Sequence, residues 1–224
     1  MTLAKEIALE DFLNENLKKG FIRESKSPQA APLFFVPKKN GKLRPCKDYW
    51  YLNKFTIKNA YPIPRTQDLL NKIGRAHVFT KLDLKNGYNN IRITQGDEWK
   101  AAFSTPRGLF EPTVMFFRLC NSPATFQAYM NNTFADFIKE GWLIAYLDDV
   151  MVLSKDQVQD RANTRRLLEQ CHEQRLQLNI NKCEFGILET NYLGFHISPE
   201  GMLTELEKLD TIMDWPEPTT SKQV

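Results

Sequence analysis

The chain has 224 residues, 42% of them hydrophobic and 25% charged, which is enough to bury the core of one large domain or of two small subdomains. The formal net charge of +3 permits a nucleic-acid partner but does not by itself predict one. The N-terminus lacks the apolar segment of a signal peptide, and no apolar run is long enough to cross a membrane, so the sequence argues against a secreted or membrane protein.

The cysteines are widely spaced and form no C-x-x-C pair. This spacing predicts reduced thiols in an intracellular protein rather than a disulfide framework or a zinc site. The cysteines are Cys46, Cys120, Cys171 and Cys183.

The N-terminal part of the chain predicts a helix and a β-hairpin. An amphipathic helix is expected over residues 4–19, ended by Gly20, and residues 27–32 are expected to form an extended linker because they include prolines. A strand over 33–36 and a return strand over 42–49 follow. The apolar face of the helix is formed by Leu9, Phe12, Leu13 and Leu17.

The turn of this hairpin, at Asn40-Gly41, is surrounded by basic residues. Asn-Gly favours a tight turn because both central positions need a positive φ. The basic side chains predict either a solvated charged turn at a sheet edge or a mobile basic finger that grips phosphates. They belong to Lys38, Lys39, Lys42 and Arg44.

The next segment predicts a helix over 65–73, ended by Gly74, and a strand over 78–84. Asp83 lies at the end of this strand, on the face opposite Leu82, and Lys85-Asn86-Gly87-Tyr88 follows. Asp83 is therefore either an ordinary turn aspartate or a carboxylate placed to meet a ligand.

Short strands are expected at 90–93 and 101–104, and a helix is expected to begin at Ser122, with Ser122 as N-cap. A further helix is expected over 156–177, and short strands over 178–203. Taken together, the elements predict an α+β fold in which helices pack on a mostly antiparallel sheet. The inward residues of the 156–177 helix are expected to be Val158, Ala162, Leu167, Leu168 and Cys171.

The stretch 143–153 predicts a β-hairpin with two carboxylates at its tip. Apolar residues with strand propensity lie on both sides of Asp148-Asp149, and an Asp-Asp pair favours a tight turn. Two adjacent carboxylates repel each other, and a hard divalent cation such as Mg²⁺ would relieve the repulsion. The alternative is a solvated acidic turn, which is the more common meaning of an isolated Asp-Asp.

Tyr146-Leu147-Asp148-Asp149 and the stretch 82–88, Leu-Asp-Leu-Lys-Asn-Gly-Tyr, resemble the two metal-binding motifs of reverse transcriptases from gypsy-type long-terminal-repeat retrotransposons (Metaviridae). The resemblance extends along nearly the whole chain. It implies a right-hand polymerase with fingers over 1–75, a palm over 76–205 that is interrupted by a fingers segment at about 90–120, and the start of a thumb over 206–224. Further matching segments are 20–28, 36–41, 52–53, 61–65, 121–127, 182–185 and 192–196.

The resemblance implies an RNA-directed DNA polymerase in which Asp83, Asp148 and Asp149 bind two Mg²⁺ ions, with Mn²⁺ as an alternative. The implied partners are an RNA or DNA template with its primer and deoxynucleoside triphosphates. Ribonuclease H and integrase domains of a polyprotein are expected but absent from this chain. The implied location is cytoplasmic or nuclear, with virus-like particles as one possibility.

Other site residues follow from the resemblance alone. Lys38, Lys39 and Arg44 match positions that hold the triphosphate, and Arg44 is favoured because a guanidinium binds phosphate oxygens bidentately. Tyr88 matches an aromatic gate that rejects a 2′-hydroxyl, although a core tyrosine is the alternative. The remaining expectations are nucleotide contacts at Phe117 and Lys182, template or primer contacts at Gln127 and Tyr146, and a core position for Phe126.

Several residues depart from the family pattern. The segment 115–121 carries Phe116 where the family has proline and Arg118 where it has glycine; a glycine there would permit a positive φ or a close backbone approach. Trp50 replaces arginine, and Lys47 occupies an apolar strand position. These changes suggest a decaying element copy with an intact triad and a damaged nucleotide pocket. The alternatives are a weakly active nucleic-acid-binding remnant, an RNA-directed RNA polymerase or, least favoured, a structural domain.

Overall fold

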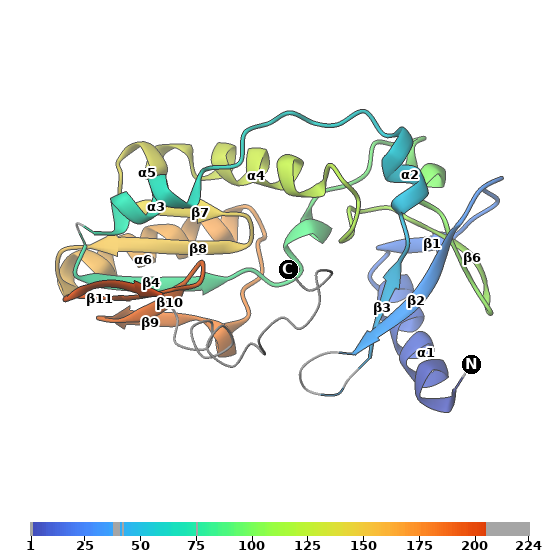
Figure 1. Cartoon of the computed structure of the whole chain (residues 1–224), viewed down its shortest axis with the longest axis horizontal. Helices are drawn as coiled ribbons and strands as arrows, with labels where there is room; N and C mark the ends of the chain where they lie inside the picture. Colours follow the sequence, from blue (N-terminus) through green and yellow to red (C-terminus); the bar gives the residue numbers. More distant parts are fainter. Residues whose placement is uncertain (1, 38–40, 42, 75, 205–224) are drawn as a thin grey trace, which may run out of the picture. The chain divides into compact units, whose positions relative to one another are not determined.

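A computed structural model describes residues 2–37, 41, 43–74 and 76–204 (Figure 1). The chain divides into two compact units, each built from two stretches of sequence. Unit 1 comprises residues 1–63 and 85–133, and unit 2 comprises residues 64–84 and 134–224. The assignment of these units to fingers and palm stays a prediction, and the expected thumb segment 206–224 lies outside the described residues.

Unit 1 is a five-stranded sheet in the order β1-β6-β5-β2-β3, in which only the β2–β5 pair is parallel. Helix α1 packs against this sheet, and its Leu9 and Leu13 share a buried cluster with Phe103 and Phe116. The elements are α1 (Leu3–Lys18), β1 (Ile22–Glu24), β2 (Ala31–Pro37), β3 (Leu43–Lys47), α2 (Trp50–Phe55), β5 (Phe103–Thr105), β6 (Gly108–Pro112) and α4 (Ser122–Thr133), with 3₁₀ helices η1 (Gly87–Asn90) and η2 (Glu98–Ala101).

Helix α1 ends as its sequence predicts. Gly20 has a φ of +66°, and the amides of Gly20 and Phe21 donate to the carbonyls of Leu17 and Asn16, which is a Schellman motif. The buried face differs in one place: Leu17 is 41% exposed, and Asn16 is buried instead. The Asn16 side chain is tolerated there because its amide donates to the carbonyl of Phe12.

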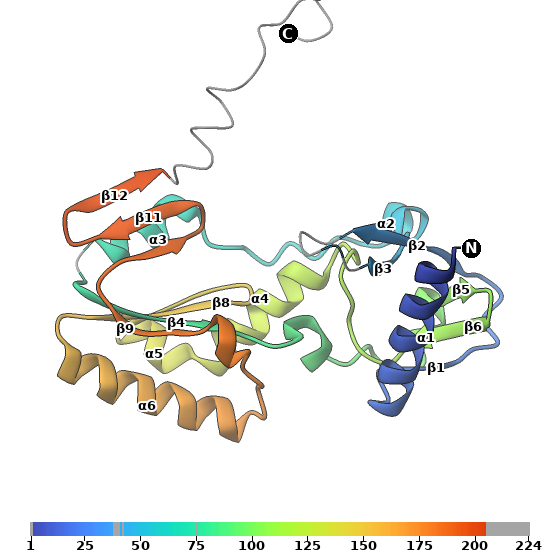
Figure 2. The same cartoon turned by 90° about the horizontal axis from the view of Figure 1, so that it is seen from below.

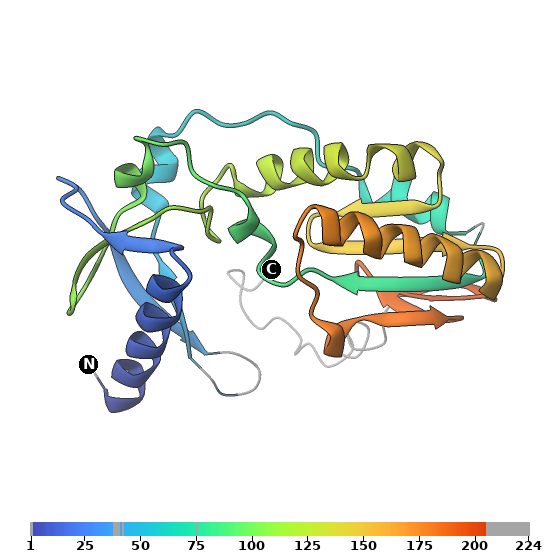
Figure 3. The same ribbon diagram turned by 180° about the vertical axis from the view of Figure 1, so that it is seen from behind.

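Unit 2 is built on the antiparallel sheet β7-β8-β4-β9. One face packs on α3 and the small sheet β10-β11-β12, and the other is covered by α6, as Figures 2 and 3 show. The elements are α3 (Thr66–Ile73), β4 (Val78–Asp83), α5 (Ala135–Lys139), β7 (Leu143–Tyr146), β8 (Asp149–Ser154), α6 (Gln157–Glu173), η3 (Ile180–Lys182), β9 (Glu184–Ile187), β10 (Thr190–Tyr192), β11 (Phe195–Ser198) and β12 (Gly201–Thr204).

The predicted α+β class, with helices on mostly antiparallel sheets, is confirmed. The strand expected at 90–93 is wrong, because the chain forms the 3₁₀ helix η1 there and then a single bridge between Arg92 and Val114. Ser122 does not act as an N-cap: it is the first residue of α4, and its hydroxyl donates to the carbonyl of Phe116.

Helix α6 begins one residue later than expected and buries a different face. Asp156 is its N-cap and accepts a hydrogen bond from the amide of Gln159. Val158 is 80% exposed and Ala162 is also exposed, which corrects their predicted inward positions. Polar residues occupy the buried face at this end, because Asp160 accepts a hydrogen bond from Thr80 of β4 at 2.8 Å.

Lys47 of β3 lies inside unit 1, with only 3% of its surface exposed. Its ammonium lies 3.5 Å from the ring centroid of Phe116, 4.3 Å from that of Phe12 and 5.0 Å from that of Phe103. Burial lowers the pKa of Lys47 to about 7, and the neighbouring Cys46 acts in the opposite direction. We call the rings of Phe12, Phe103 and Phe116 the aromatic cage of Lys47. The Lys47 amine in this cage is therefore partly neutral near pH 7.

Among the described residues, no helix is both long and apolar enough to cross a membrane. The cysteines, which lie in both units, are all free thiols.

Replacing Lys47 with methionine should stabilise the protein and flatten its pH dependence. The pKa of Lys47 is lower in the folded chain than in the unfolded chain, so the unfolded state binds more protons above about pH 7 and stability rises with pH. The slope contributed by Lys47 is about 1.4 kcal/mol per pH unit. Urea unfolding at about pH 7 and about pH 9 measures it. The control is Lys54→Met, at an exposed lysine. If the free energy of unfolding of Lys47→Met changes with pH as steeply as that of the wild type, Lys47 does not have a lowered pKa in the cage.

Candidate active site

The hairpin of β7 and β8 closes through the two-residue turn Leu147-Asp148, and Tyr146 pairs with Asp149 across it. Leu147 has a φ of +54°, a conformation that a leucine seldom adopts and that costs free energy. The predicted hairpin is present, but only Asp148 lies in its turn: Asp149 is the first residue of β8, which corrects the expectation of two carboxylates at the tip.

Asp83, the last residue of β4, is the register partner of Asp149. Two directly opposed residues of an antiparallel pair point to the same face of the sheet, so their carboxylates are neighbours. The pKa of Asp149 is raised, first by burial and then by the charge of Asp148, with Asp83 adding to the effect. Lys81 and Lys182 act in the opposite direction. The three aspartates therefore lie close enough to repel one another.

The loop after α6 holds Asp83 in place. The amide of Asn179 donates to the carbonyl of Asp83 at 2.9 Å, and the amide of Asp83 meets the sulfur of Cys183 at 3.5 Å. Between these contacts, the ammonium of Lys182 lies 3.4 Å from Oδ2 of Asp83. Asn179 was not singled out from the sequence; its role is a backbone contact, which no side-chain pattern predicts.

The donor chemistry of the three aspartates fits a hard divalent cation, because each offers carboxylate oxygens and their mutual repulsion would be relieved by positive charge. In the part of the chain that the structure describes, however, no three His, Cys, Asp or Glu side chains converge closely enough to hold a metal ion. The role of Asp83, Asp148 and Asp149 as metal ligands stays a prediction.

Of the residues expected to contact the nucleotide, Arg44, Tyr88 and Phe117 lie in unit 1, whereas Lys182 lies in unit 2 beside Asp83. Arg44 of β3 and Phe117 line a groove of about 810 Å³, with the guanidinium carbon 6.0 Å from the ring centroid. Tyr88 of η1 is 8% exposed and packs edge-on against Phe117 at 4.9 Å and Phe126 at 5.2 Å. Phe126 is fully buried, as expected for a core residue. Lys38 and Lys39 lie outside the described residues.

The two residues expected to touch template or primer lie in different surroundings. Tyr146 is partly exposed at the end of β7. Gln127 of α4 is fully buried, and its amide donates to Oδ1 of Asn131 at 2.9 Å. Gln127 thus shows no surface to a template in this structure, and both roles stay predictions.

Of the residues that depart from the family pattern, Arg118 is the one with a strained backbone. Its φ is +76°, as expected at a position suited to glycine. Its guanidinium carbon lies 4.7 Å from the ring centroid of Phe34. Asn53 holds the loop from both sides, donating to the carbonyl of Arg118 at 2.7 Å and accepting from the amide of Cys120 at 2.9 Å.

Of the other departures, Phe116 and Lys47 border the groove that contains Arg44 and Phe117, although both are largely buried. Phe116 and Lys47 contact each other in the core of unit 1, so these two unusual residues accommodate one another. Trp50 is 71% exposed on α2 and is absent from the lining of the groove that contains Arg44 and Phe117. The expectation that these changes damage a nucleotide pocket stays a prediction.

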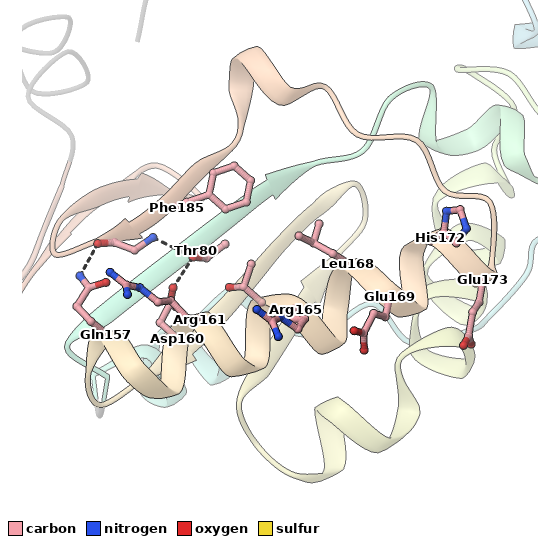
Figure 4. A pocket seen from close by; sticks show the side chains of 12 residues that line it. Thr80, Gln157, Asp160, Arg161, Arg165, Leu168, Glu169, His172, Glu173 and Phe185 are labelled. Atoms are coloured by element: carbon pink, nitrogen blue, oxygen red, sulfur yellow. Dashed lines mark hydrogen bonds between the residues drawn. The ribbon is translucent and has the colours of Figure 1, made fainter.

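A second hollow, of about 790 Å³, lies along α6 in unit 2 (Figure 4). Thr80 forms its floor by donating to Asp160 and accepting from the amide of Gly186 at 3.0 Å, while Phe185 borders it. None of the site residues expected from the sequence lines this hollow. Thr80 points to the α6 face of the sheet, opposite the face that carries Asp83 and Asp149.

Comparison with known proteins decides the family. Residues 36–197 match the model of the reverse transcriptase (RNA-dependent DNA polymerase) family. The chain belongs to this family. Reverse transcriptases in general use divalent metals.

The curated relatives of this reverse transcriptase domain include the transposon Tf2-3 and Tf2-7 polyproteins of Schizosaccharomyces pombe, 41% and 40% identical over 217 residues. Each match covers 97% of this chain but only 16% of the relative's length. Tf2 elements are gypsy-type long-terminal-repeat retrotransposons, so the resemblance read from the sequence motifs is confirmed.

Two solved structures of foamy viral protease–reverse transcriptase share the fold. One, in complex with double-stranded DNA, has a TM-score of 0.91 at 23% identity and covers 99% of this chain and 39% of its own. The other, in complex with an RNA/DNA hybrid, has a TM-score of 0.88 at 22% identity and covers 100% of this chain and 30% of its own. The predicted right-hand polymerase fold is thereby confirmed.

Replacing Arg118 with glycine should raise stability, whereas Arg118→Ala should lower it. Glycine removes the cost of a positive φ, about 1–2 kcal/mol, which exceeds the loss of the contact with Phe34, about 0.5–1 kcal/mol. Arg118→Ala keeps the strained positive φ and loses the contact with Phe34, so its free energy of unfolding should be lower than that of the wild type. Urea unfolding of both variants measures the difference.

Arg175, whose φ is +56° after the end of α6, provides the control for this test. Arg175→Gly should also be stabilising, because it relieves the same backbone conformation. If Arg118→Gly is less stable than Arg118→Ala, the loop is not strained at this residue.

Proposed function

We propose that this chain is an RNA-directed DNA polymerase that adds deoxynucleotides to a primer 3′-hydroxyl. The observation that supports it most is the register of β4 with β8, which pairs Asp83 with Asp149 beside the turn residue Asp148. Phosphoryl transfer needs charge neutralisation and positioning more than covalent catalysis, and three carboxylates at one sheet end suit that task.

Asp83, Asp148 and Asp149 would together hold two Mg²⁺ ions, or Mn²⁺ in their place. When bound, such ions activate the attacking hydroxyl and neutralise the leaving pyrophosphate. Lys182 keeps a positive charge beside Asp83 and is the residue we assign to donate a proton to the pyrophosphate. Asn179 and Cys183 fix the backbone of Asp83, so they act as positioning residues.

The other residues assigned to the nucleotide belong to unit 1. Arg44 binds triphosphate oxygens, helped by Lys38 and Lys39, and Tyr88 lies beneath the sugar with Phe117 against it. The ring of Tyr88 packs edge-on against the ring of Phe117 and against that of Phe126, and these contacts fix its position. A steric gate against a 2′-hydroxyl needs such a fixed ring.

The partners we propose are an RNA or DNA template with its primer and deoxynucleoside triphosphates, because related structures hold double-stranded DNA and an RNA/DNA hybrid. Tyr146 and Gln127 are assigned to template or primer. Since the chain spans 16% of its transposon relatives, ribonuclease H and integrase are proposed as neighbours in a polyprotein, in an intracellular setting.

A second candidate is a weakly active or inactive remnant that binds nucleic acid. It is favoured by the strained backbone of Arg118, whose φ of +76° is a conformation suited to glycine. The two candidates differ in whether metal-dependent incorporation occurs.

Primer extension on an RNA template with Mg²⁺ and deoxynucleotides tests the proposal. We expect incorporation that falls by about a hundred- to a thousandfold in Asp148→Asn, the scale of loss seen when one group that stabilises transition-state charge is removed. The exposed Asp68→Asn in unit 2 is the matched control and should keep wild-type activity.

Arg118→Gly serves as the repaired chain in the same assay. Activity in the repaired chain alone would favour the remnant and place the defect at Arg118. Equal activity in Asp148→Asn and in Asp68→Asn would refute the assignment of the aspartates.

A further inference from the structure

The hollow of about 790 Å³ along α6 in unit 2 has a buried polar floor (Figure 4). Asp160 and Thr164 both line it, although Asp160 is only 2% exposed and Thr164 only 9%. Oδ2 of Asp160 accepts the hydrogen bond from Thr80. Among the described residues, Oδ1 of Asp160 and Oγ1 of Thr164 have no hydrogen-bond partner. A buried acceptor without a donor costs free energy, so both oxygens are suited to accept from a molecule in the hollow.

These two oxygens belong to one row of side chains on α6. Asp160 and Thr164 are four residues apart, so they lie on the same face of the helix in successive turns. A planar group with several N–H donors suits two such acceptors better than a single N–H does, and a guanidinium has five donors in a fixed plane. Nδ2 of Asn163 also has no partner within the described part of the chain, but Asn163 does not line the hollow.

Apolar side chains border the hollow beside this polar floor. Leu168, the next residue of the same row, is 37% exposed, and Phe185 of β9 is 46% exposed. Figure 4 shows Phe185 on the β9 side of the hollow and Leu168 on α6. Single exposed apolar residues are ordinary, but these two border the same space as the oxygen of Asp160 that has no partner. An occupant with an apolar part would remove both from water.

The charged groups around the hollow differ in their exposure to water. Of its ionisable lining residues that the structure describes, Asp160 is the one that is buried. Water and salt screen exposed charges of either sign, whereas a buried carboxylate acts at short range with little screening. The hollow therefore favours a cation. The exposed ionisable residues that line it are Arg161, Arg165, Glu169, His172 and Glu173.

We propose that the hollow along α6 binds a guanidinium or amidinium group on a short apolar stem. The planar cation donates to Oδ1 of Asp160 and to Oγ1 of Thr164, and the stem packs against Leu168 and Phe185. A free small cation and the arginine side chain of a partner protein share this chemistry. The site lies on the face of the sheet opposite the aspartates of β4 and β8, so it requires neither those residues nor a metal.

Isothermal titration calorimetry of the full chain with phenylguanidinium tests the site. A ligand of this size has a Kd of about 1 mM at ordinary ligand efficiency, so the titration uses millimolar ligand. Phenylurea is the matched neutral ligand, because it has nearly the same shape without the charge. It should bind about tenfold more weakly, which is the difference between a neutral hydrogen bond and one to a charged group.

Asp160→Asn removes the charge and presents an amide donor to the hollow, while its oxygen can still accept from Thr80. It should weaken the binding of phenylguanidinium about ten- to hundredfold. Thr164→Val, which keeps the shape of the side chain, should weaken it about two- to tenfold. Glu169→Gln is the matched control: it makes the same kind of change at an exposed carboxylate that lines the hollow, and should bind like the wild type. Thermal unfolding without ligand shows that each variant is folded.

Acetyl-arginine amide, titrated in parallel, distinguishes the two sources of the cation. Tighter binding of phenylguanidinium would indicate a free small cation, and tighter binding of the arginine amide would indicate a side chain of a partner protein. Both results support the site if Asp160→Asn weakens the binding. Binding of neither ligand at millimolar concentration would overturn the proposal, as would equal affinities of Asp160→Asn and Glu169→Gln, because Oδ1 of Asp160 would then meet only water.

Discussion

The structure of unit 2 has to accommodate the repulsion among three carboxylates at the end of one sheet. Asp83 and Asp149 are opposed in register, and Asp148 lies beside them in a turn that requires a positive φ at Leu147. The raised pKa of Asp149 reflects burial and then the two neighbouring charges. Such an arrangement costs folding free energy, and the surrounding structure offsets it: a sheet packed on both faces, backbone contacts to Asp83, and the ammonium groups of Lys81 and Lys182. A strained turn that brings like charges together is typical of a functional site.

Unit 1 shows a different way of tolerating unusual residues. Lys47 and Phe116 each look damaging alone, yet in the fold they are adjacent, and the aromatic cage accepts an amine whose pKa is lowered to about 7. Trp50 takes an exposed place on α2, where it costs little packing. Arg118 has a positive φ, a conformation suited to glycine, and its guanidinium contacts the ring of Phe34. The departures from the family pattern are therefore compatible with a folded domain, and their effect on activity is a separate question.

Local signals predicted much of the fold. Gly20 predicted the end of α1, and Asp148-Asp149 predicted the position of the β7–β8 hairpin, because turn chemistry acts over a few residues. The pairing of Asp83 with Asp149 followed only from the resemblance, since register between distant strands has no local signal. The buried face of α6 was missed in part because Asp160 finds its hydrogen-bond partner, Thr80, far away in sequence. The cage around Lys47 was missed for the same reason: its rings come from α1, β5 and the segment before α4.

Thermal unfolding of the wild type and Asp148→Asn, in EDTA and in Mg²⁺, tests the claim about the carboxylates most directly. In EDTA we expect Asp148→Asn to be the more stable protein, because one repelling charge is gone. Adding Mg²⁺ should raise the unfolding temperature of the wild type and leave the variant almost unchanged. An equal response of both proteins to Mg²⁺, with the variant the less stable in EDTA, would contradict a cation site built on mutual repulsion of Asp83, Asp148 and Asp149.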